Sequence, residues 1–88
     1  MIDATEAIQI AETKLPVLVP AFAALQPHVE EIQQSKDGQV WVITFRAKNP
    51  DPKSDSPYGG SFLAYIEKEV RVAAASGDLL AVLNPSYS

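Results

Sequence analysis

EVRVAAASGDLLAVL, residues 69–83, predicts two apolar β-strands joined by a tight turn. Val70, Val72 and Val82 are β-branched, which suits the pleated, half-buried surface of a sheet. The turn falls on residues 75–78, where Gly77 can adopt the positive φ that such turns require. We therefore expect a hairpin here, and the rest of the chain must pack on it or pair with its edges.

The first part of the chain predicts one amphipathic helix. Asp3 can cap its first turn, and Glu6 follows three residues later, at the spacing of a capping box. Apolar residues then recur at the spacing of one helix face: Ala4, Ala7, Ile8, Ala11 and Leu15. Pro16 disfavours helical geometry at the residue before it, so the expected helix spans residues 4–15.

Residues 16–27, PVLVPAFAALQP, are strongly apolar but interrupted by prolines. Pro20 fits the first turn of a short helix over residues 21–25. One interpretation is that the apolar side chains of this segment extend the core: Val17, Leu18, Phe22 and Leu25. The other is that they form an exposed patch for a partner. The small size of the chain favours the core.

A second hairpin is predicted from residues 29–35 and 39–47, with Lys36-Asp37-Gly38 as its turn. In the second arm, alternation places Trp41, Ile43 and Phe45 on one face, which we expect to point at the helix and to bury Trp41 largely. The first arm, VEEIQQS, is polar and is typical of an edge strand that resists aggregation.

Residues 48–61, KNPDPKSDSPYGGS, have the composition of a long exposed loop. Loops of this length are usually functional or mobile, and both interpretations stay open here. Residues 62–74 then return as an alternating strand, interrupted by Lys68. Either a bulge shifts the register at Lys68, or Lys68 lies where the strand overhangs its neighbour.

These elements predict an α+β fold, with one main N-terminal helix packed on a four-stranded antiparallel sheet in the order helix, hairpin, long loop, hairpin. The 88 residues suffice for a single domain, residues 1–88. A formal net charge of −4 makes nucleic acid and anionic membranes unexpected partners, because both attract basic surfaces. No disulfide is predicted, because the sequence has no cysteine.

The sequence also bears on location. Residues 1–6 show no basic segment followed by an apolar run, so no signal peptide is visible. Pro16 and Pro20 interrupt the longest apolar run, which is too short for a membrane span. We therefore expect a cytoplasmic protein, or a secreted one if a leader precedes residue 1.

No enzyme class is supported by the sequence. Glu67 and Glu69 share a strand face, but pairing with Arg46 and Arg71 is favoured over a catalytic acid pair. His28 is the single histidine, so neither a histidine metal cluster nor a histidine relay can form around it. We predict no cofactor and no metal site.

Three stretches resemble PepSY-like domains, which are small modules with a helix packed on an antiparallel sheet: residues 7–11, 29–45 and 72–80. The last, VAAASGDLL, is similar to the family's turn V-D-x-x-T-G-E-V-L, with Ala73, Ser76 and Asp78 in place of its aspartate, threonine and glutamate. The long polar loop before a strand also resembles small bacterial immunity-protein families. The resemblance implies a non-catalytic module that inhibits a peptidase or acts as an immunity protein.

We therefore expect a binding or inhibitory module for a protein partner. The alternative is a small enzyme or ligand carrier that uses the cleft between helix and sheet. A deep pocket lined by Tyr65 or His28 together with acids would favour the alternative. The residues most expected to contact a partner lie in the long loop: Asp55, Tyr58, Gly59 and Gly60.

Tyr58→Ala is expected to weaken partner binding by about 1–3 kcal/mol if Tyr58 is an interface hot spot. Replacing residues 51–57 by a short Gly-Ser link is expected to leave the free energy of unfolding nearly unchanged, because loop-closure entropy varies slowly with length. Titration calorimetry and urea unfolding measure the two effects. If both variants bind the partner as tightly as the parent, the contact lies elsewhere, and residues 29–35 are the next to test.

Overall fold

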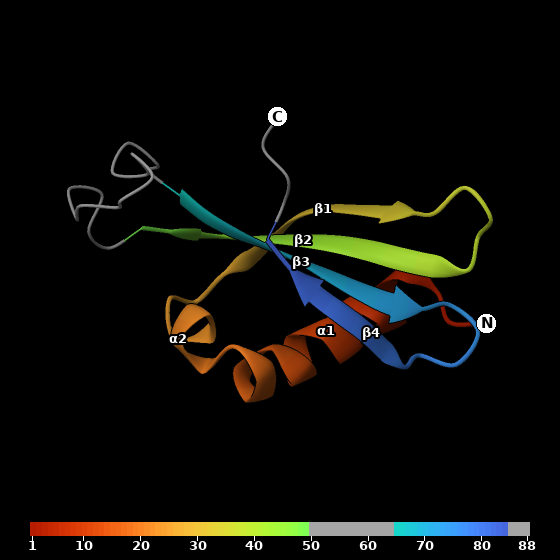
Figure 1. Ribbon diagram of the computed structural model, residues 1–88, viewed down its shortest axis with the longest axis horizontal. Helices are drawn as coiled ribbons and strands as arrows, with labels where there is room; N and C mark the ends of the chain where they lie inside the picture. The colour runs from red at the N-terminus through yellow and green to blue at the C-terminus, as the bar shows by residue number, and fades with distance from the viewer. Residues whose placement is uncertain (50–64, 85–88) are drawn as a thin grey trace.

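The computed structural model describes residues 1–49 and 65–84. It contains two helices and four strands: α1 (Ala4–Leu18), α2 (Pro20–Ala23), β1 (His28–Gln34), β2 (Val40–Lys48), β3 (Tyr65–Ala73) and β4 (Leu79–Leu83). The strands form an antiparallel sheet in the order β1-β2-β3-β4, and both helices lie on one side of it (Figure 1). The predicted α+β fold is confirmed.

α1 begins where its sequence signals place it. The Asp3 side chain accepts a hydrogen bond of 2.8 Å from the Glu6 backbone N–H. Ala7, Ala11 and Leu15 are buried, as the apolar stripe predicts. Because two of the three are alanines, the helix backbone can lie close to the sheet.

The predicted end of this helix at residue 15 is wrong, because α1 continues through Pro16 to Leu18. A proline in the last turn removes one N–H, yet the turn still closes through a 2.8 Å bond from the Val19 N–H to the Leu15 carbonyl. Helical geometry also keeps the Leu15 side chain in the core, and this burial outweighs the bias against helix at the residue before proline.

Because α1 is longer than predicted, two apolar residues after Pro16 lie in its last turn and outside the core. Val17 and Leu18 are 76% and 46% exposed, so the prediction that they extend the core is wrong for these two. Phe22 is buried and Leu25 is partly buried, as predicted. α2 begins at Pro20, which occupies the first helical turn, and it ends at Ala23, two residues before the predicted end.

The core lies between α1 and the centre of the sheet. Its sheet side consists of residues from the two central strands: Ile43, Phe45 and Ala47 of β2, and Val70 and Val72 of β3. Trp41 shares this face and packs against the core, although it is less completely buried than Ile43 and Phe45. Its indole N–H donates a 3.2 Å bond to the Ile2 carbonyl, so residues that precede α1 cover it in part.

Strand pairing settles the position of Lys68. β3 pairs with β2 without a register shift, so no bulge between these strands lies at Lys68. The last pair between β3 and β4 joins Glu69 to Leu83, and Lys68 therefore lies just beyond the paired part of β4, as the second interpretation has it. Two predicted segments lie outside the described residues. One is the predicted loop from residue 50 onward, which contains the proposed contact residues Asp55, Tyr58, Gly59 and Gly60. The other is the first three residues of the predicted third strand.

Both hairpin turns use a glycine with positive φ, at +73° for Gly38 and +78° for Gly77. In the first turn, the Ser35 hydroxyl and the Gln39 backbone N–H donate to Asp37 and hold the pKa of its carboxyl below its usual value. In the second, the Gly77 N–H bonds to the Ala73 carbonyl at 2.8 Å. The predicted turn chemistry is confirmed.

Gly38 and Gly77 have similar φ angles but different surroundings, so the same substitution at the two positions can be compared. An alanine at either strains the backbone by about 1–2 kcal/mol. At Gly77 the new methyl group would also lie 3.0 Å from Ile10 Cδ1, whereas at Gly38 the nearest atom is Gln34 Nε2 at 3.8 Å. We therefore expect Gly77→Ala to lower the free energy of unfolding by about 1 kcal/mol more than Gly38→Ala.

Urea unfolding followed through Trp41 fluorescence measures both variants. Equal losses would show that Ile10 moves aside without cost.

Candidate functional site

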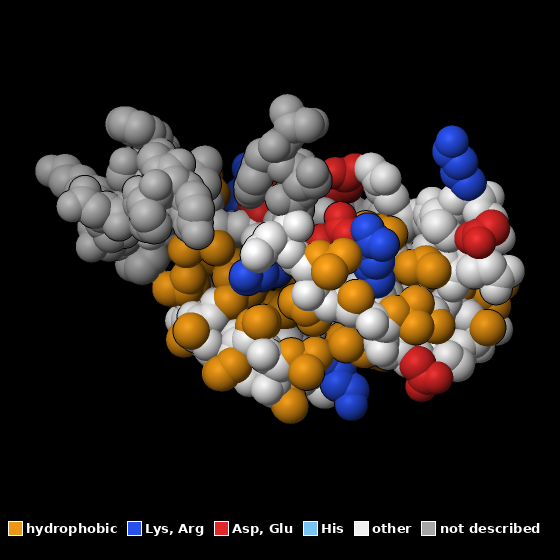
Figure 2. Space-filling model, in the orientation of Figure 1, with side chains coloured by type: hydrophobic (Ala, Val, Ile, Leu, Met, Phe, Trp, Pro, Cys, Tyr) orange, Lys and Arg blue, Asp and Glu red, His pale blue; other side chains and the backbone are white. Residues whose placement is uncertain are grey.

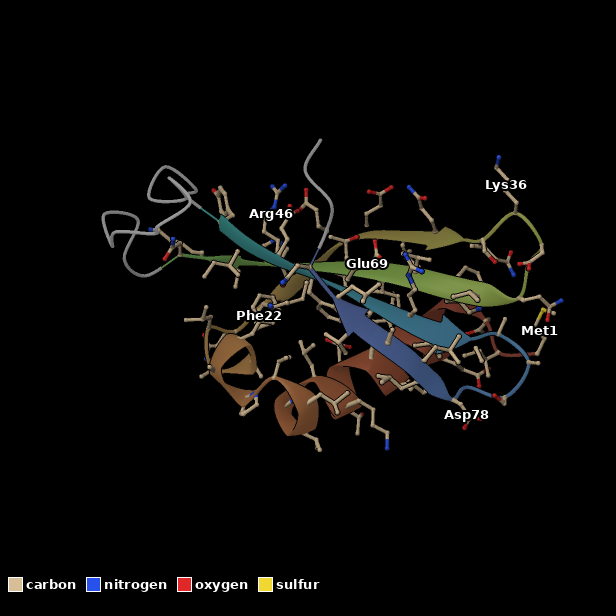
Figure 3. All side chains as sticks on the ribbon, in the orientation of Figure 1. Met1, Phe22, Lys36, Arg46, Glu69 and Asp78 are labelled. Atoms are coloured by element: carbon tan, nitrogen blue, oxygen red, sulfur yellow. The ribbon has the colours of Figure 1, made fainter. Side chains whose placement is uncertain are left out.

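The face of the sheet away from the helices carries a network of charges centred on Arg46 (Figure 3). Its Nη2 lies 3.2 Å from Glu67 Oε2 on β3, and its Nη1 lies 3.4 Å from Glu30 Oε1 on β1. The guanidinium also stacks over the Tyr65 ring, at 5.1 Å from the centroid. Arg46 therefore joins three neighbouring strands.

The two carboxylates that were weighed as a catalytic pair are both engaged by arginines. Glu67 pairs with Arg46 across the strands, and Glu69 Oε2 lies 2.8 Å from Nε of Arg71, two residues along the same strand. The prediction that they pair with these arginines is confirmed, although the second pair is not cross-strand. Charge pairing on a solvated face is a structural role.

A metal site would need several ligating side chains close together among the described residues. His28 begins β1, is exposed, and lies with its Nε2 3.5 Å from Glu30 Oε2. Across residues 1–49 and 65–84, no three His, Cys, Asp or Glu side chains come close enough together to hold a metal ion.

Two open hollows on α1 bear on the alternative of a ligand carrier. One, of about 180 Å³, lies between α1, α2 and β2, and Glu12 and Gln26 are among the residues that line it. The other, of about 260 Å³, lies on the outer surface of α1 around Ile10. Both are smaller than the usual 300–1,000 Å³ of ligand sites. Neither His28 nor Tyr65 lines them.

A larger hollow lies between the end of α1 and the sheet. We call it the α1–β4 groove, and it has a volume of about 340 Å³. Its described lining consists of apolar side chains, one amide and one lysine: Leu18, Val19, Leu79, Val82, Leu83, Asn84 and Lys68. The extension of α1 through Pro16 brings Leu18 to this place, and the overhang of β3 brings Lys68.

The groove adjoins a strand edge without charges. Among the described strands β4 pairs with β3 alone, so the amide groups on its other edge face away from the sheet. Leu80 is 54% exposed and Leu83 is 40% exposed. Leu80 is also the extra, unpaired residue of a bulge in the register between β3 and β4.

The two edges of the sheet differ. β1, the opposite edge, carries Glu30 and Glu31 and has a bulge between Val29 and Glu31. Charges and bulges both discourage edge-to-edge pairing. β4 has a bulge but only Leu, Ala and Val. Hydrophobic side chains gather over α1, α2 and β4 in the lower half of Figure 2.

Sequence reasoning missed this site, although two signals for it were present. The alternative interpretation of residues 16–27 as an exposed patch holds for Val17 and Leu18. In addition, LLAVL at residues 79–83 is a continuous apolar run where a half-buried strand would alternate. The residues that were predicted to bind a partner cannot be compared with the groove, because they lie outside the described residues.

Comparison with protein-family models, with curated proteins and with solved structures gave no match. The resemblance to PepSY-like domains therefore stays a prediction. Of the helices in residues 1–49 and 65–84, none is long and apolar enough to cross a membrane.

The charge network predicts that Arg46 and Arg71 contribute unequally to the free energy of unfolding. Arg46→Met is expected to lower the free energy of unfolding by about 1–2 kcal/mol, because it removes two ion pairs between strands and a stacked ring. Arg71→Met, which removes one pair within β3, is expected to change it by less than about 0.5 kcal/mol. Urea unfolding of both variants measures the difference, and equal effects would contradict a bridging role for Arg46.

Proposed function

We propose that this chain is a non-catalytic module that binds a protein partner through the α1–β4 groove and the adjoining edge of β4. The observation that carries the proposal is the exposure of Leu80 and Leu83 on an uncharged edge strand, together with a groove that Leu83 and the exposed Leu18 both line. The resemblance to PepSY-like and immunity-protein families supports it, because such modules act by binding proteins. A cytoplasmic location and the absence of enzyme activity stay predictions.

The strand edge supplies directional binding. Unpaired N–H and C=O groups along β4 can bond to an extended segment of a partner, which adds to the sheet as a further strand. The apolar side chains on either side supply the free energy. Full burial of one leucine side chain contributes about 1.5–3 kcal/mol, which corresponds to about a tenfold change in affinity or more.

The charged face of the sheet is a less favourable surface for a partner than the edge of β4. Arg46 and Arg71 there are already engaged by Glu30, Glu67 and Glu69. A partner on that face would have to replace these ion pairs, whereas a partner at β4 would cover apolar side chains that now face water.

A matched pair of edge substitutions tests the proposal. Leu80→Lys on β4 places a charge where the partner binds, and Gln33→Lys places the same charge on β1, at another exposed position. Partners retained from an extract by the unchanged chain are identified by mass spectrometry and then purified for titration calorimetry. We expect Leu80→Lys to weaken binding at least tenfold, about 1.4 kcal/mol, and Gln33→Lys to leave it unchanged.

If the partner binds both variants as tightly as the parent, its contact is not at β4. The segment that contains Tyr58 is then the next surface to test.

A further inference from the structure

Lys68 occupies an unusual position for a lysine. It lies on β3 between Ile66 and Val70, which face the helix side of the sheet with it, and Val70 is fully buried. Among the described residues that line the α1–β4 groove, Lys68 carries the only charge. Lysines on such faces usually carry their ammonium group out along apolar neighbours to water.

The ammonium group of Lys68 has a neutral partner. Its Nζ donates to Oδ1 of Asn84, and no carboxylate of residues 1–49 and 65–84 lies within ion-pair distance of it. By contrast, Arg46 and Arg71 on the opposite face are each paired with a carboxylate. A positive charge between apolar walls attracts an anion more strongly than it would in open water, because the walls exclude solvent.

The position of Lys68 on β3, relative to the end of the neighbouring strand β4, matters as much as its charge. Leu83 is opposite Glu69, so Lys68 is next to the end of β4. Residues 81–83 are the regular part of this strand, beyond the bulge at Leu80. A segment that pairs with the outer edge of residues 81–83 would pass the mouth of the groove and then come level with Lys68.

The distance between strands allows the contact. Neighbouring strands lie about 4.8 Å apart, so a strand added to β4 would lie about 10 Å from β3. Lysine and glutamate side chains that extend toward each other span this gap. An apolar side chain on the added strand would at the same time point into the groove, between Leu18 and Val82.

We propose that the partner contributes an extended segment that adds to β4 as a fifth strand, with apolar side chains over Leu18 and Val82 and a carboxylate at Lys68. This inference rests on the proposed function and specifies its ligand. Charge complementarity favours an acidic segment here. The chain as a whole carries a net charge of −4, yet the described lining of the groove is positive.

The probe is a displayed library of random twelve-residue peptides, selected on the whole chain. We expect the enriched peptides to alternate apolar residues, to lack proline in their centre and to carry Asp or Glu near one end. Each is then synthesised with its acid and with the corresponding amide, and fluorescence anisotropy gives both affinities. The acid form is expected to bind about tenfold more tightly than the amide form.

Variants at Lys68 identify the cation. Lys68→Gln is expected to abolish the preference for the acid form, and Lys68→Arg is expected to keep it. Lys36→Gln, in the turn between β1 and β2 (Figure 3), removes one lysine charge far from the groove and is expected to change nothing. Circular dichroism of each variant confirms that its fold is intact.

The outcomes separate this inference from the proposed function. Equal binding of acid and amide forms, or a preference that persists in Lys68→Gln, overturns the role of Lys68, while loss of binding in Leu80→Lys would still place the interface at β4. Enrichment of no peptide overturns the extended segment as the ligand. A dimer of the free chain that Leu80→Lys dissociates, seen by sedimentation, also overturns it, because the occupant is then a second copy of the chain.

Discussion

Close packing of α1 on the two central strands is the contact on which the remaining structure depends. Ala7 and Ala11 present almost no side chain, so the helix can approach the central strands, and with Leu15 they form one buried cluster with Ile43, Phe45 and Val70. β1 and β4 have their strand partners in this central pair. The helix covers one face of the sheet and extends past its core, and this extension creates one wall of the groove.

Features encoded by a few neighbouring residues could be predicted from the sequence. The Asp3 cap and the two glycine turns need only local chemistry, and both were found as predicted. Pro16 was misjudged because its local bias competes with the burial of Leu15, which only the packed structure reveals. The sequence also left two interpretations of Lys68 open, because the environment of this residue on β3 depends on where the neighbouring strand β4 ends.

The candidate site was the harder inference, because exposure is a property of the assembled fold. LLAVL reads as core in any window of the sequence, yet Leu80 and Leu83 are exposed once β4 becomes an edge. The polar edge was correctly recognised in β1, because charged side chains are visible as such in the sequence. An apolar edge has no comparable mark, and it emerges only from strand order.

The hydrogen bonds at Ile2 have a consequence for the rate of folding. Its N–H bonds to the carbonyl of Ala74, and its carbonyl accepts from the indole of Trp41. Both bonds join residues distant in sequence, so a large part of the chain must be ordered before either can form. Contacts of this kind raise the contact order, and a high contact order is associated with slow folding because chain entropy must be lost before such contacts form. We therefore expect the backbone around Ile2 to become ordered late in folding, after the helix and hairpins have met.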